Sequence, residues 1–222
     1  MNCLVVTGTN TDIGKTIVTA AIAALAADDG LRVAVVKPAQ TGVAEAEAGD
    51  VDVVRRLSGV TDVHELVRYP EPLAPATAAR RAGVVPLSVA EMADRIRELA
   101  DRDLVIVEGA GGLLVQLDDK GGTLADLARL LDSPVLVVAA PGLGTLNAIA
   151  LTCEAIRRRD LVCQGVVFGS WPEHADLAMN ENVNDVADYA HAPLLGALPE
   201  GAGRLDPCAF RDVARASLRI PS

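Results

Sequence analysis

Short runs of hydrophobic residues alternate along the chain with longer segments in which hydrophobic residues recur at helical spacing. The hydrophobic runs, each bounded by glycine, proline or a charged residue, occupy positions 4–6, 33–36, 104–107, 135–138 and 162–168. Continuous runs of this length are typical of strands that are buried on both faces. The segments between them predict helices over 14–28, 50–58, 88–101, 123–131, 144–158 and 174–189. This alternation predicts an α/β fold, with a mostly parallel sheet covered by helices on both faces.

Two segments interrupt the alternation. Residues 38–49 form a predicted loop rich in Gly, Ala and Glu, and residues 66–87, with prolines at 70, 72, 75 and 86, predict a long surface excursion. Long loops in compact domains are often functional. The tail from about residue 201 predicts one further helix. Because neither a repeat nor a linker divides the chain, we expect a single domain over residues 1–222.

Composition narrows the class of protein. The 222 residues are 50% hydrophobic but only 2% aromatic, so we expect a core of Val, Leu, Ile and Ala. A net charge of -10 disfavours a nucleic-acid partner, because an acidic chain repels phosphodiester backbones. The one basic run, Arg157–Arg159, is expected to complement the dipole at a helix end, and a local nucleic-acid patch is the alternative.

The cysteines and the longest apolar stretch indicate the cellular compartment of the protein. The four cysteines, at positions 3, 153, 163 and 208, form no Cys-x-x-Cys pair and no zinc-spaced cluster, so we expect small buried side chains in a reducing compartment. The longest apolar stretch, Ile17–Ala27, is shorter than the roughly 20 residues that a membrane span needs. The first predicted strand begins at about residue 3, and no signal peptide precedes it. We therefore expect a cytoplasmic protein without a membrane partner.

A glycine-rich loop follows the first predicted strand and opens the first predicted helix. It reads Gly8-Thr-Asn-Thr-Asp-Ile-Gly-Lys-Thr16. In P-loop NTPases such a loop surrounds an anion with backbone N–H groups, its lysine reaches the β/γ-phosphates, and its hydroxyl binds Mg²⁺. Here five residues separate the two glycines in place of the usual four. An ordinary glycine turn does not require Lys15 and Thr16, so we predict binding of a nucleoside triphosphate.

The other strand ends are candidate site residues, because open α/β sheets bind ligands beyond the carboxyl ends of their strands. Lys37 follows the second strand and Glu108 the third, where P-loop proteins commonly hold a metal-binding carboxylate. Lys37 is either a charge that neutralises the transferred phosphoryl group or a solvated lysine. Asp50 is either a second Mg²⁺ ligand or a helix N-cap. The later strand ends, Ala140–Thr145 and Phe168–Trp171, also carry glycine.

Four motifs occur in a fixed order along the chain. They are Gly8–Thr16, Lys37-Pro-Ala-Gln-Thr-Gly42, Glu108-Gly-Ala-Gly-Gly112 and Pro193-Leu-Leu-Gly-Ala-Leu-Pro199. Their combination, over about residues 3–200, resembles the dethiobiotin synthetase family of P-loop NTPases. The resemblance implies an ATP- and Mg²⁺-dependent ring closure in biotin synthesis, from 7,8-diaminononanoate and CO₂ or bicarbonate. One amine takes up CO₂ as a carbamate, the γ-phosphate converts the carbamate into a mixed anhydride, and the second amine expels phosphate. Such chemistry depends on positioning and charge neutralisation rather than on a protein nucleophile.

The resemblance also implies roles for individual residues. Lys15 and Lys37 are the implied catalytic residues, and the implied Mg²⁺ ligands are Thr16, Asp50 and Glu108. The implied nucleotide-binding residues are Thr11, Asp12, Ile13, Gly14, Lys15, Thr16, Glu108, Gly109, Ala110, Gly111, Phe168, Gly169, Ala197, Leu198 and Pro199. The implied substrate-binding residues are Thr11, Lys37, Thr41, Gly142, Leu143, Gly144, Thr145, Leu146 and Asn147. The last six open a helix whose N–H groups would bind the substrate carboxylate, reached across the two-fold interface of a homodimer.

Two positions depart from the family pattern. The family often places an asparagine after the fifth strand, where its amide reads the adenine edge, and Gly169 takes that place here. A glycine cannot supply the paired donor and acceptor of an amide. We therefore predict weakened selectivity for ATP and use of another triphosphate such as CTP. Leu177 stands roughly where some relatives place a tyrosine near the substrate tail.

Two rival functions share this type of phosphate loop. Amide synthases of the same P-loop branch usually carry a glutaminase domain, for which the chain has no room after residue 200. Partition and septum-site ATPases place an extra lysine early in the loop, where this chain has Thr9 and Asn10. They also need a basic face or a membrane helix, which the acidic sequence does not predict.

Overall fold

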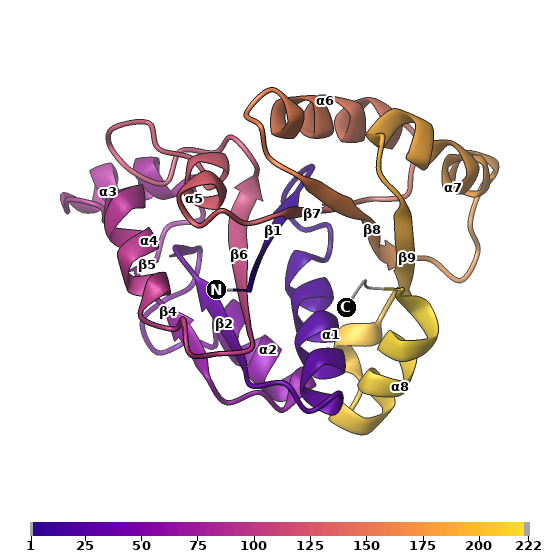
Figure 1. Ribbon diagram of the computed structural model, residues 1–222, viewed down its shortest axis with the longest axis horizontal. Helices are drawn as coiled ribbons and strands as arrows, with labels where there is room; N and C mark the ends of the chain where they lie inside the picture. The colour runs from indigo at the N-terminus through magenta and orange to yellow at the C-terminus, as the bar shows by residue number, and fades with distance from the viewer. Residues whose placement is uncertain (1, 220–222) are drawn as a thin grey trace.

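Seven parallel strands form the central sheet of the computed structural model, which describes residues 2–219 (Figure 1). They are β1 (Cys3–Gly8), β2 (Val33–Lys37), β4 (Val63–Glu65), β6 (Leu104–Gly112), β7 (Val135–Ala139), β8 (Cys163–Trp171) and β9 (Leu194–Pro199). Their order across the sheet is β4-β2-β6-β1-β7-β8-β9, and each neighbouring pair is parallel. The predicted parallel sheet is therefore confirmed, with the phosphate-loop strand β1 at its centre.

Helices cover both faces of the sheet. They are α1 (Lys15–Asp28), α2 (Asp50–Ser58), α3 (Pro75–Ala82), α4 (Val89–Arg97), α5 (Leu124–Leu130), α6 (Thr145–Arg157), α7 (Leu177–Ala190) and α8 (Pro207–Ser217), with a 3-10 turn at Ala202–Arg204. Helices α1, α2 and α8 bury their apolar sides against one face, and α4, α5, α6 and α7 against the other. Figure 1 shows α1 and α8 below the sheet and α6 above it.

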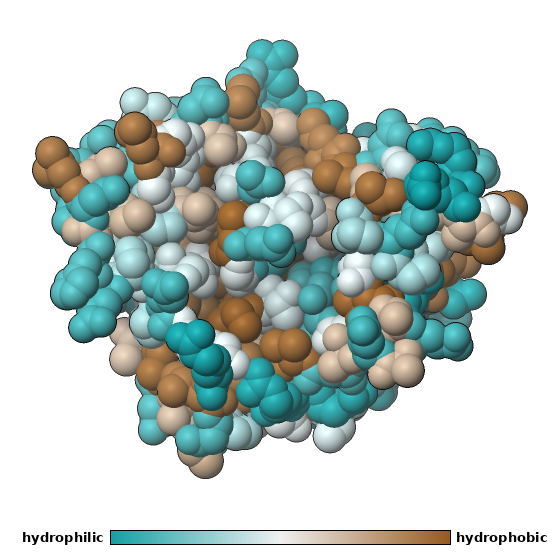
Figure 2. All heavy atoms as spheres, turned by 180° about the vertical axis from the view of Figure 1, so that it is seen from behind, coloured by the Kyte–Doolittle hydropathy of each residue, from teal (hydrophilic) through white to brown (hydrophobic). Residues whose placement is uncertain are grey.

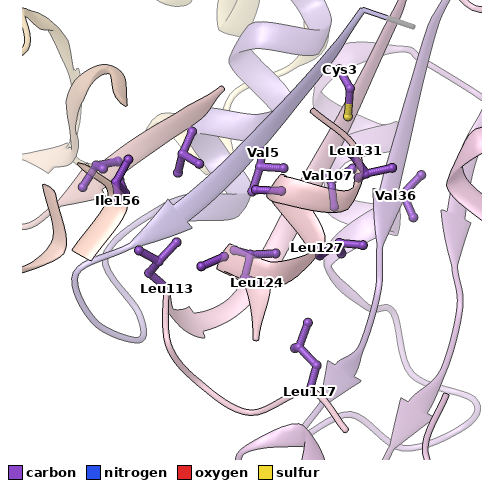
Figure 3. Packing of buried hydrophobic residues seen from close by; sticks show 14 of the residues in the cluster. Cys3, Val5, Val36, Val107, Leu113, Leu117, Leu124, Leu127, Leu131 and Ile156 are labelled. Carbon is purple, nitrogen blue, oxygen red and sulfur yellow. The ribbon is translucent and has the colours of Figure 1, made fainter. Parts of the chain in front are cut away.

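The core is split in two by the sheet, because successive side chains of a strand point to opposite faces. Val5 of β1 lies in the cluster under α5, and its neighbour Val6 lies in the cluster under α1. Figure 3 shows Val5 and Val107 facing Leu124 and Leu127 of α5. Fully burying a Val or Leu side chain contributes about 1.5–3 kcal/mol, so these two layers supply the main drive to fold.

The sheet has two strands that the hydrophobic runs do not predict. Strand β4 has the sequence Val-His-Glu and lacks a continuous apolar run. Strand β9 is interrupted by Gly196, which has a φ of 136°, and a Cβ there would lie 2.0 Å from the Ser217 carbonyl oxygen. Both strands lie at the edges of the sheet. Edge strands bury less apolar side chain, so their sequence pattern is weaker.

The predicted surface excursion at 66–87 is wrong in part, since it contains regular structure. Residues Gln40–Thr41 (β3) pair with Arg68–Tyr69 (β5) in a small parallel sheet, and α3 packs beside it. Ala78 and Ala79 of α3 are buried with Tyr69. Pro75 stands in the first turn of α3, where a missing N–H costs nothing, so proline here starts a helix.

Two helices begin at a residue whose side chain caps the helix. The side chains of Ser88 and Thr123 accept hydrogen bonds from the backbone N–H groups of Glu91 and Asp126, which return the contact as capping boxes. Helix α4 ends at Arg97, short of the predicted residue 101. The backbone hydrogen bonds that follow connect residues three apart, which is the pattern of turns rather than of an α-helix.

The predictions for the cysteines and the basic run have mixed outcomes. Cys3 and Cys153 are buried as expected, Cys163 is half-buried, and the expectation is wrong for Cys208, which is exposed. The basic run lies at the end of α6, where Arg157 donates to the Ala190 carbonyl. Within residues 2–219, no helix has the length and apolar character to cross a membrane. Figure 2 shows one face of the molecule, where hydrophobic side chains lie in small groups among polar ones.

Candidate active site

The phosphate loop connects the end of β1 to the start of α1. Gly14, the residue before α1, has a left-handed backbone with φ of 92°, and Asp12 is also left-handed with φ of 57°. No side chain caps the start of α1. Uncapped N–H groups at a helix N-terminus, preceded by left-handed turns, form a concavity that favours an anion. The local geometry therefore suits a phosphate group.

The end of β8 packs directly against this loop. A Cβ built on Gly169 would lie 2.0 Å from the Ile13 carbonyl oxygen, and one on Gly14 would lie 2.4 Å from the Gly169 carbonyl oxygen. Neither distance is compatible with a side chain. The glycine at 169 is therefore required by the approach of the two backbones, which explains why no amide side chain stands at that position.

Lys37, the last residue of β2, lies between the carboxylates of Glu108, in the middle of the neighbouring strand β6, and Asp50, at the start of α2. Its Nζ is 2.8 Å from Glu108 Oε1, 2.5 Å from Asp50 Oδ2 and 3.1 Å from the Gly109 carbonyl oxygen. Strands β2 and β6 are parallel neighbours with Val36 opposite Val107, so Lys37 and Glu108 lie side by side. The prediction that Glu108 follows its strand is wrong, because β6 continues to Gly112. Lys37 is only 4% exposed, and its interpretation as a solvated lysine is wrong.

Asp50 is the first residue of α2 rather than its N-cap, which is Gly49. The Asp50 N–H donates to Gln40 Oε1 at 2.9 Å, and its carboxylate faces Lys37. The N-cap alternative is therefore wrong, and the Asp50 carboxylate is available to the site.

The two lysines of the site have opposite electrostatic environments. Burial alone would lower the pKa of Lys37, but Glu108 and Asp50 outweigh burial and raise it. The pKa of Lys15 is lowered, first by burial and then by the positive charge of Lys37. In this structure the Lys15 ammonium donates to the Asn10 carbonyl at 2.9 Å. Two neighbouring cations, one of them with few protein partners, favour binding of a polyanion.

These groups line one cavity of about 520 Å³. Its lining consists of Thr11, Asp12, Ile13, Gly14, Lys15, Thr16, Ile17, Lys37, Gln40, Thr41, Val43, Asp50, Glu108, Ala110 and Gly111. The cavity brings together the loop, both lysines and both acidic residues. A second cavity, of about 410 Å³, lies at the opposite ends of the strands, around Leu4, Ile22 and Leu104. It contains none of the predicted residues.

Comparison with known proteins agrees with the motif order. The AAA domain family matches residues 2–203. The ATP-dependent dethiobiotin synthetase BioD of Frankia casuarinae is 62% identical over 220 residues, covering 99% of this chain and 92% of the relative. The protein of the same name from Saccharopolyspora erythraea is 62% identical over 219 residues, covering 98% of this chain and 96% of the relative. The chain belongs to the dethiobiotin synthetase family.

Solved structures show the fold of this family member in more distant proteins. The cell division ATPase MinD of Pyrococcus furiosus has a TM-score of 0.62 with 18% identity, covering 97% of this chain and 98% of that one. MinD from Pyrococcus horikoshii, solved with Mg-ADP, has a TM-score of 0.60 with 15% identity, covering 97% of this chain and 95% of that one. At such identities the similarity concerns the fold alone. The dethiobiotin synthetase relatives decide against the septum-site alternative.

The other predicted residues of this dethiobiotin synthetase family member lie outside the lysine cavity. Phe168 is fully buried against Trp171, with ring centroids 5.7 Å apart, so only its backbone is available to a ligand. The end of β9 lies beside the end of β8, since the Glu200 N–H donates to the Trp171 carbonyl at 2.7 Å. Leu198 is buried, whereas Ala197 and Pro199 are accessible. Gly109 contributes its carbonyl to Lys37, and its Cα packs under Leu124.

The segment Gly142–Asn147 opens α6 away from the lysine cavity. Gly144 is the residue before the helix and has a left-handed backbone with φ of 90°, and no side chain caps the helix. Leu143 is 91% exposed, whereas Thr145 is buried and its hydroxyl has no partner among the described residues. The structure thus places an uncapped helix start there, separate from the phosphate loop.

Four residues near these sites are not among the predicted site residues. Ile17, Gln40 and Val43 line the lysine cavity. Asn182 of α7 is 6% exposed and donates to the Pro141 and Gly142 carbonyls at 2.7 and 3.3 Å. Gln40 lies inside the Lys37–Gly42 motif, so the motif could have identified it as a site residue. Nothing in the α7 sequence distinguishes Asn182 from its neighbours Asn180 and Asn184.

Proposed function

We propose that this chain is an ATP-dependent dethiobiotin synthetase, acting in one domain over residues 1–222. It closes the ring of 7,8-diaminononanoate with CO₂ to form dethiobiotin in biotin biosynthesis. The arrangement that carries the proposal is the placement of Lys37 between Glu108 and Asp50, facing the phosphate loop across one cavity. Family membership supplies the reaction, and this arrangement supports the presence of its machinery.

The proposed chemistry needs positioned charge rather than a protein nucleophile. A carbamate oxygen attacks the γ-phosphorus, the bond to the β-γ bridging oxygen breaks, and the nucleoside diphosphate leaves. The second amine then attacks the carbamic-phosphoric anhydride carbon, phosphate leaves, and the amine loses its proton. Negative charge develops on the transferred phosphoryl group, where nearby cations stabilise it.

Lys15 and Lys37 are the proposed cations for this step. Lys37 is held by two carboxylates and stays charged, because they raise its pKa. Its ammonium therefore has a fixed position that costs no reorganisation during the reaction. Lys15 follows Gly14 in the phosphate loop, where the equivalent lysine of P-loop proteins reaches the β/γ-phosphates. Thr11 and Thr41 line the same cavity and are the proposed contacts of the diamine end.

Mg²⁺ fits the donor set of the site. Glu108 Oε1 accepts from Thr16 Oγ1 at 2.8 Å, and Asp50 reaches the same lysine as Glu108. The described residues contain no cluster of three or more His, Cys, Asp or Glu side chains that could hold a metal ion. Mg²⁺ usually takes one or two carboxylates together with phosphates and water, which suits this set. We propose that Thr16, Asp50 and Glu108 hold it, where it would neutralise phosphate charge.

The substrate carboxylate is proposed to bind at Gly142–Asn147, in a homodimer whose partner supplies the other part of the site. The N–H groups at the uncapped start of α6 and the unpartnered Thr145 hydroxyl support this assignment. Leu177 is 77% exposed at the start of α7, so it remains a candidate for contact with the substrate tail.

The base of the nucleotide is proposed to lie beside Gly169 and Ala197–Pro199. Because no side chain fits at 169, only backbone groups there can read the base. We therefore predict modest discrimination between ATP and CTP. Turnover with ATP, CTP and GTP in direct competition tests this prediction, and a strong preference for ATP would contradict it.

Phosphate release in the presence and absence of each substrate tests the function itself. We expect release only when 7,8-diaminononanoate and bicarbonate are present together with nucleotide and Mg²⁺. Release that needs no diamine would indicate a switch ATPase and would contradict the proposed function.

A further inference from the structure

Two cysteines from different elements lie side by side away from the nucleotide cavity. Cys153 is buried in the second half of α6, and Cys163, the first residue of β8, is half-buried. Their Sγ atoms are 3.8 Å apart. Cys163 Sγ also lies 3.9 Å from the Gly165 carbonyl oxygen, and with the Cys163 hydrogen directed there, Cys153 is the donor between the two sulfurs. The proposed reaction uses neither thiol.

The surroundings make Cys163 the more nucleophilic of the two. The hydrogen bond from Cys153 lowers the pKa of Cys163, and the same contact raises the pKa of Cys153. Arg157 lies one turn beyond Cys153 on α6, and its charge favours the thiolate. The guanidinium is held in place by the Ala190 carbonyl. The thiolate is the reactive form of cysteine, and Cys163 also has the greater access to solvent.

We propose that Cys153 and Cys163 form a dithiol that a peroxide oxidises to an intramolecular disulfide. The Cys163 thiolate attacks one peroxide oxygen, the O–O bond breaks, and Cys163 becomes a sulfenic acid with release of hydroxide, which takes up a proton. The Cys153 sulfur then attacks the sulfenic sulfur, gives up its proton and expels water. Overall the two thiols lose two electrons and two protons, and the peroxide is reduced to two waters.

The separation of the two sulfurs permits this bond. A disulfide has an S–S length of about 2.0 Å, so the sulfurs must approach by somewhat less than 2 Å. The bond would tie α6, which begins at Thr145, to β8, whose Gly169 packs against the phosphate loop. The dithiol therefore connects the two elements that carry the proposed carboxylate and nucleotide sites.

Peptide mapping after treatment with hydrogen peroxide tests the dithiol. In a Cys208→Ser background, which lacks the exposed thiol, we expect the peptides of Cys153 and Cys163 to become joined, with loss of two hydrogens. A thiol reductant should reverse the link. Cys153→Ser should stop at a sulfenic acid on Cys163 that dimedone traps, and Cys163→Ser should leave Cys153 reduced at the same dose.

Cys3 is the internal control, since burial raises the pKa of its thiol and no second cysteine is its partner. The proposal is wrong if Cys3 is oxidised as readily as the pair, or if the sulfenic acid forms first on Cys153. Serine is nearly isosteric with cysteine, and the thermal midpoint and nucleotide affinity of each variant report whether the fold is intact.

An independent contact suggests a positioning residue for the substrate site. The buried Asn182 amide spans from α7 to the Pro141 and Gly142 carbonyls, immediately before the segment that opens α6. A buried amide that holds a loop at two points fixes its backbone, and losing it leaves carbonyl oxygens without partners. We infer that Asn182 positions Gly142–Asn147 for the substrate carboxylate, an inference that rests on the proposed function.

Steady-state kinetics of Asn182→Leu and Asn182→Asp test this role against Asn180→Leu. Asn180 is exposed on the same helix and bonds only to the carbonyls of Ala175 and Asp176. We expect both Asn182 variants to raise KM for the diamine about tenfold, because lost hydrogen bonds loosen the loop, with kcat and nucleotide affinity nearly unchanged.

Two results separate this inference from the proposed function. If wild-type protein releases phosphate without the diamine, the function itself is wrong. If wild-type protein needs the diamine but the Asn182 variants keep the KM of Asn180→Leu, only the positioning role is wrong.

Discussion

Strands β2 and β6 are joined by two ion pairs. Before their N-terminal ends, Arg32 donates to both carboxylate oxygens of Asp103 at 3.0 Å. Further along, Lys37, the last residue of β2, lies 2.8 Å from Glu108 in the middle of β6. The Arg32 and Asp103 side chains are 61% and 38% exposed, whereas those of Lys37 and Glu108 are 5% and 2% exposed. The same strand pairing therefore creates both contacts, and burial is what distinguishes them.

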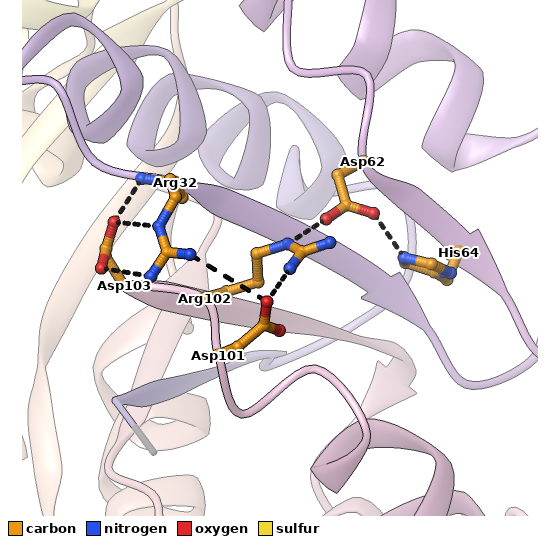
Figure 4. A network of polar contacts seen from close by, with 6 residues as sticks. All are labelled: Arg32, Asp62, His64, Asp101, Arg102 and Asp103. Atoms are coloured by element: carbon orange, nitrogen blue, oxygen red, sulfur yellow. Dashed lines mark hydrogen bonds and ion pairs between the residues drawn. The ribbon is translucent and has the colours of Figure 1, made fainter.

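The exposed pair belongs to a network whose charges satisfy one another. Arg102 bridges Asp101 and Asp62, and Asp62 accepts a hydrogen bond from His64 (Figure 4). Exposed pairs of this kind contribute little to stability, because water screens them. The buried pair instead faces a cavity with a second lysine, and burying it costs desolvation free energy that only tight pairing offsets. The presence of this costly buried pair therefore indicates that Lys37 and Glu108 have a chemical role.

The largest expected effect is the loss of turnover in Lys37→Ala. Removing a fixed cation beside the transferred phosphoryl group should lower kcat by about 10²–10³-fold, while nucleotide affinity changes little because the phosphate loop is intact. Equilibrium nucleotide binding and diamine-dependent phosphate release measure the two properties separately. Lys120→Ala, at an exposed loop position, is the matched control. Normal turnover in Lys37→Ala would mean that our assignment of Lys37 is wrong.

A double-mutant cycle sharpens the comparison through stability. The variants Lys37→Met and Glu108→Gln each leave a buried polar group without one of its partners, so each single change should destabilise the protein. We expect the double variant to be destabilised by less than the sum of the two single changes. The coupling in the free energy of unfolding should be about 1–3 kcal/mol. Chemical denaturation of the four proteins measures it. A parallel cycle with Arg32→Ala and Asp103→Asn should give a clearly smaller coupling, because solvent screens the exposed pair, and equal couplings would contradict the role that we give to burial.

The two pairs also differ in how far the sequence predicts them. Lys37 and Glu108 stand at the ends of clear hydrophobic runs, and topology alone brings such ends to one edge. The burial of Lys37 and the orientation of the Asp50 carboxylate depend on Gln40 and on the start of α2, so the sequence leaves alternatives that the structure resolves. Arg32 and Asp103 have no signal, because charged residues beside strands are usually solvated.

The same limits apply to the fold. Strands with continuous apolar runs are predicted in the right places, although β6 and β8 continue beyond their runs to Gly112 and Trp171. Strands β4 and β9 lie at sheet edges, where fewer apolar contacts are needed. Helix α3 is not predicted from the sequence, because the prolines of this segment suggest a loop, although Pro75 occupies the first turn of the helix. The function of Gly169 is also hidden, since a close approach of two backbones leaves no pattern in either segment.

The pH dependence of stability provides a smaller test on the exposed side. Hydrogen bonds from the Arg32 side chain, then from its backbone N–H, lower the pKa of Asp103 from 3.8 to about 2. A lowered pKa contributes stability above the unfolded value and loses it as pH falls towards the folded value. The difference in stability between wild type and Asp103→Asn should therefore be constant above about pH 4 and decline between about pH 4 and 2. Acid titrations of both proteins, followed by circular dichroism, measure it. A difference that persists at pH 2 would mean that the side-chain change acts through something other than this charge.

The smallest expected effect is that of Arg32→Ala. Its guanidinium is exposed and already screened, so we expect the thermal midpoint to fall by less than about 2 °C, and the difference from wild type to shrink further in high salt. Diaminononanoate-dependent turnover should be unchanged, because Arg32 is at the opposite end of β2 from Lys37. Thermal unfolding at low and high ionic strength, with Lys37→Met measured alongside, separates the two pairs. The deficit of Lys37→Met should be insensitive to salt, since ions do not reach a side chain that is 5% exposed. A salt-sensitive deficit there would mean that the Lys37 site is open to water, and that its fixed position is not the property that matters for catalysis.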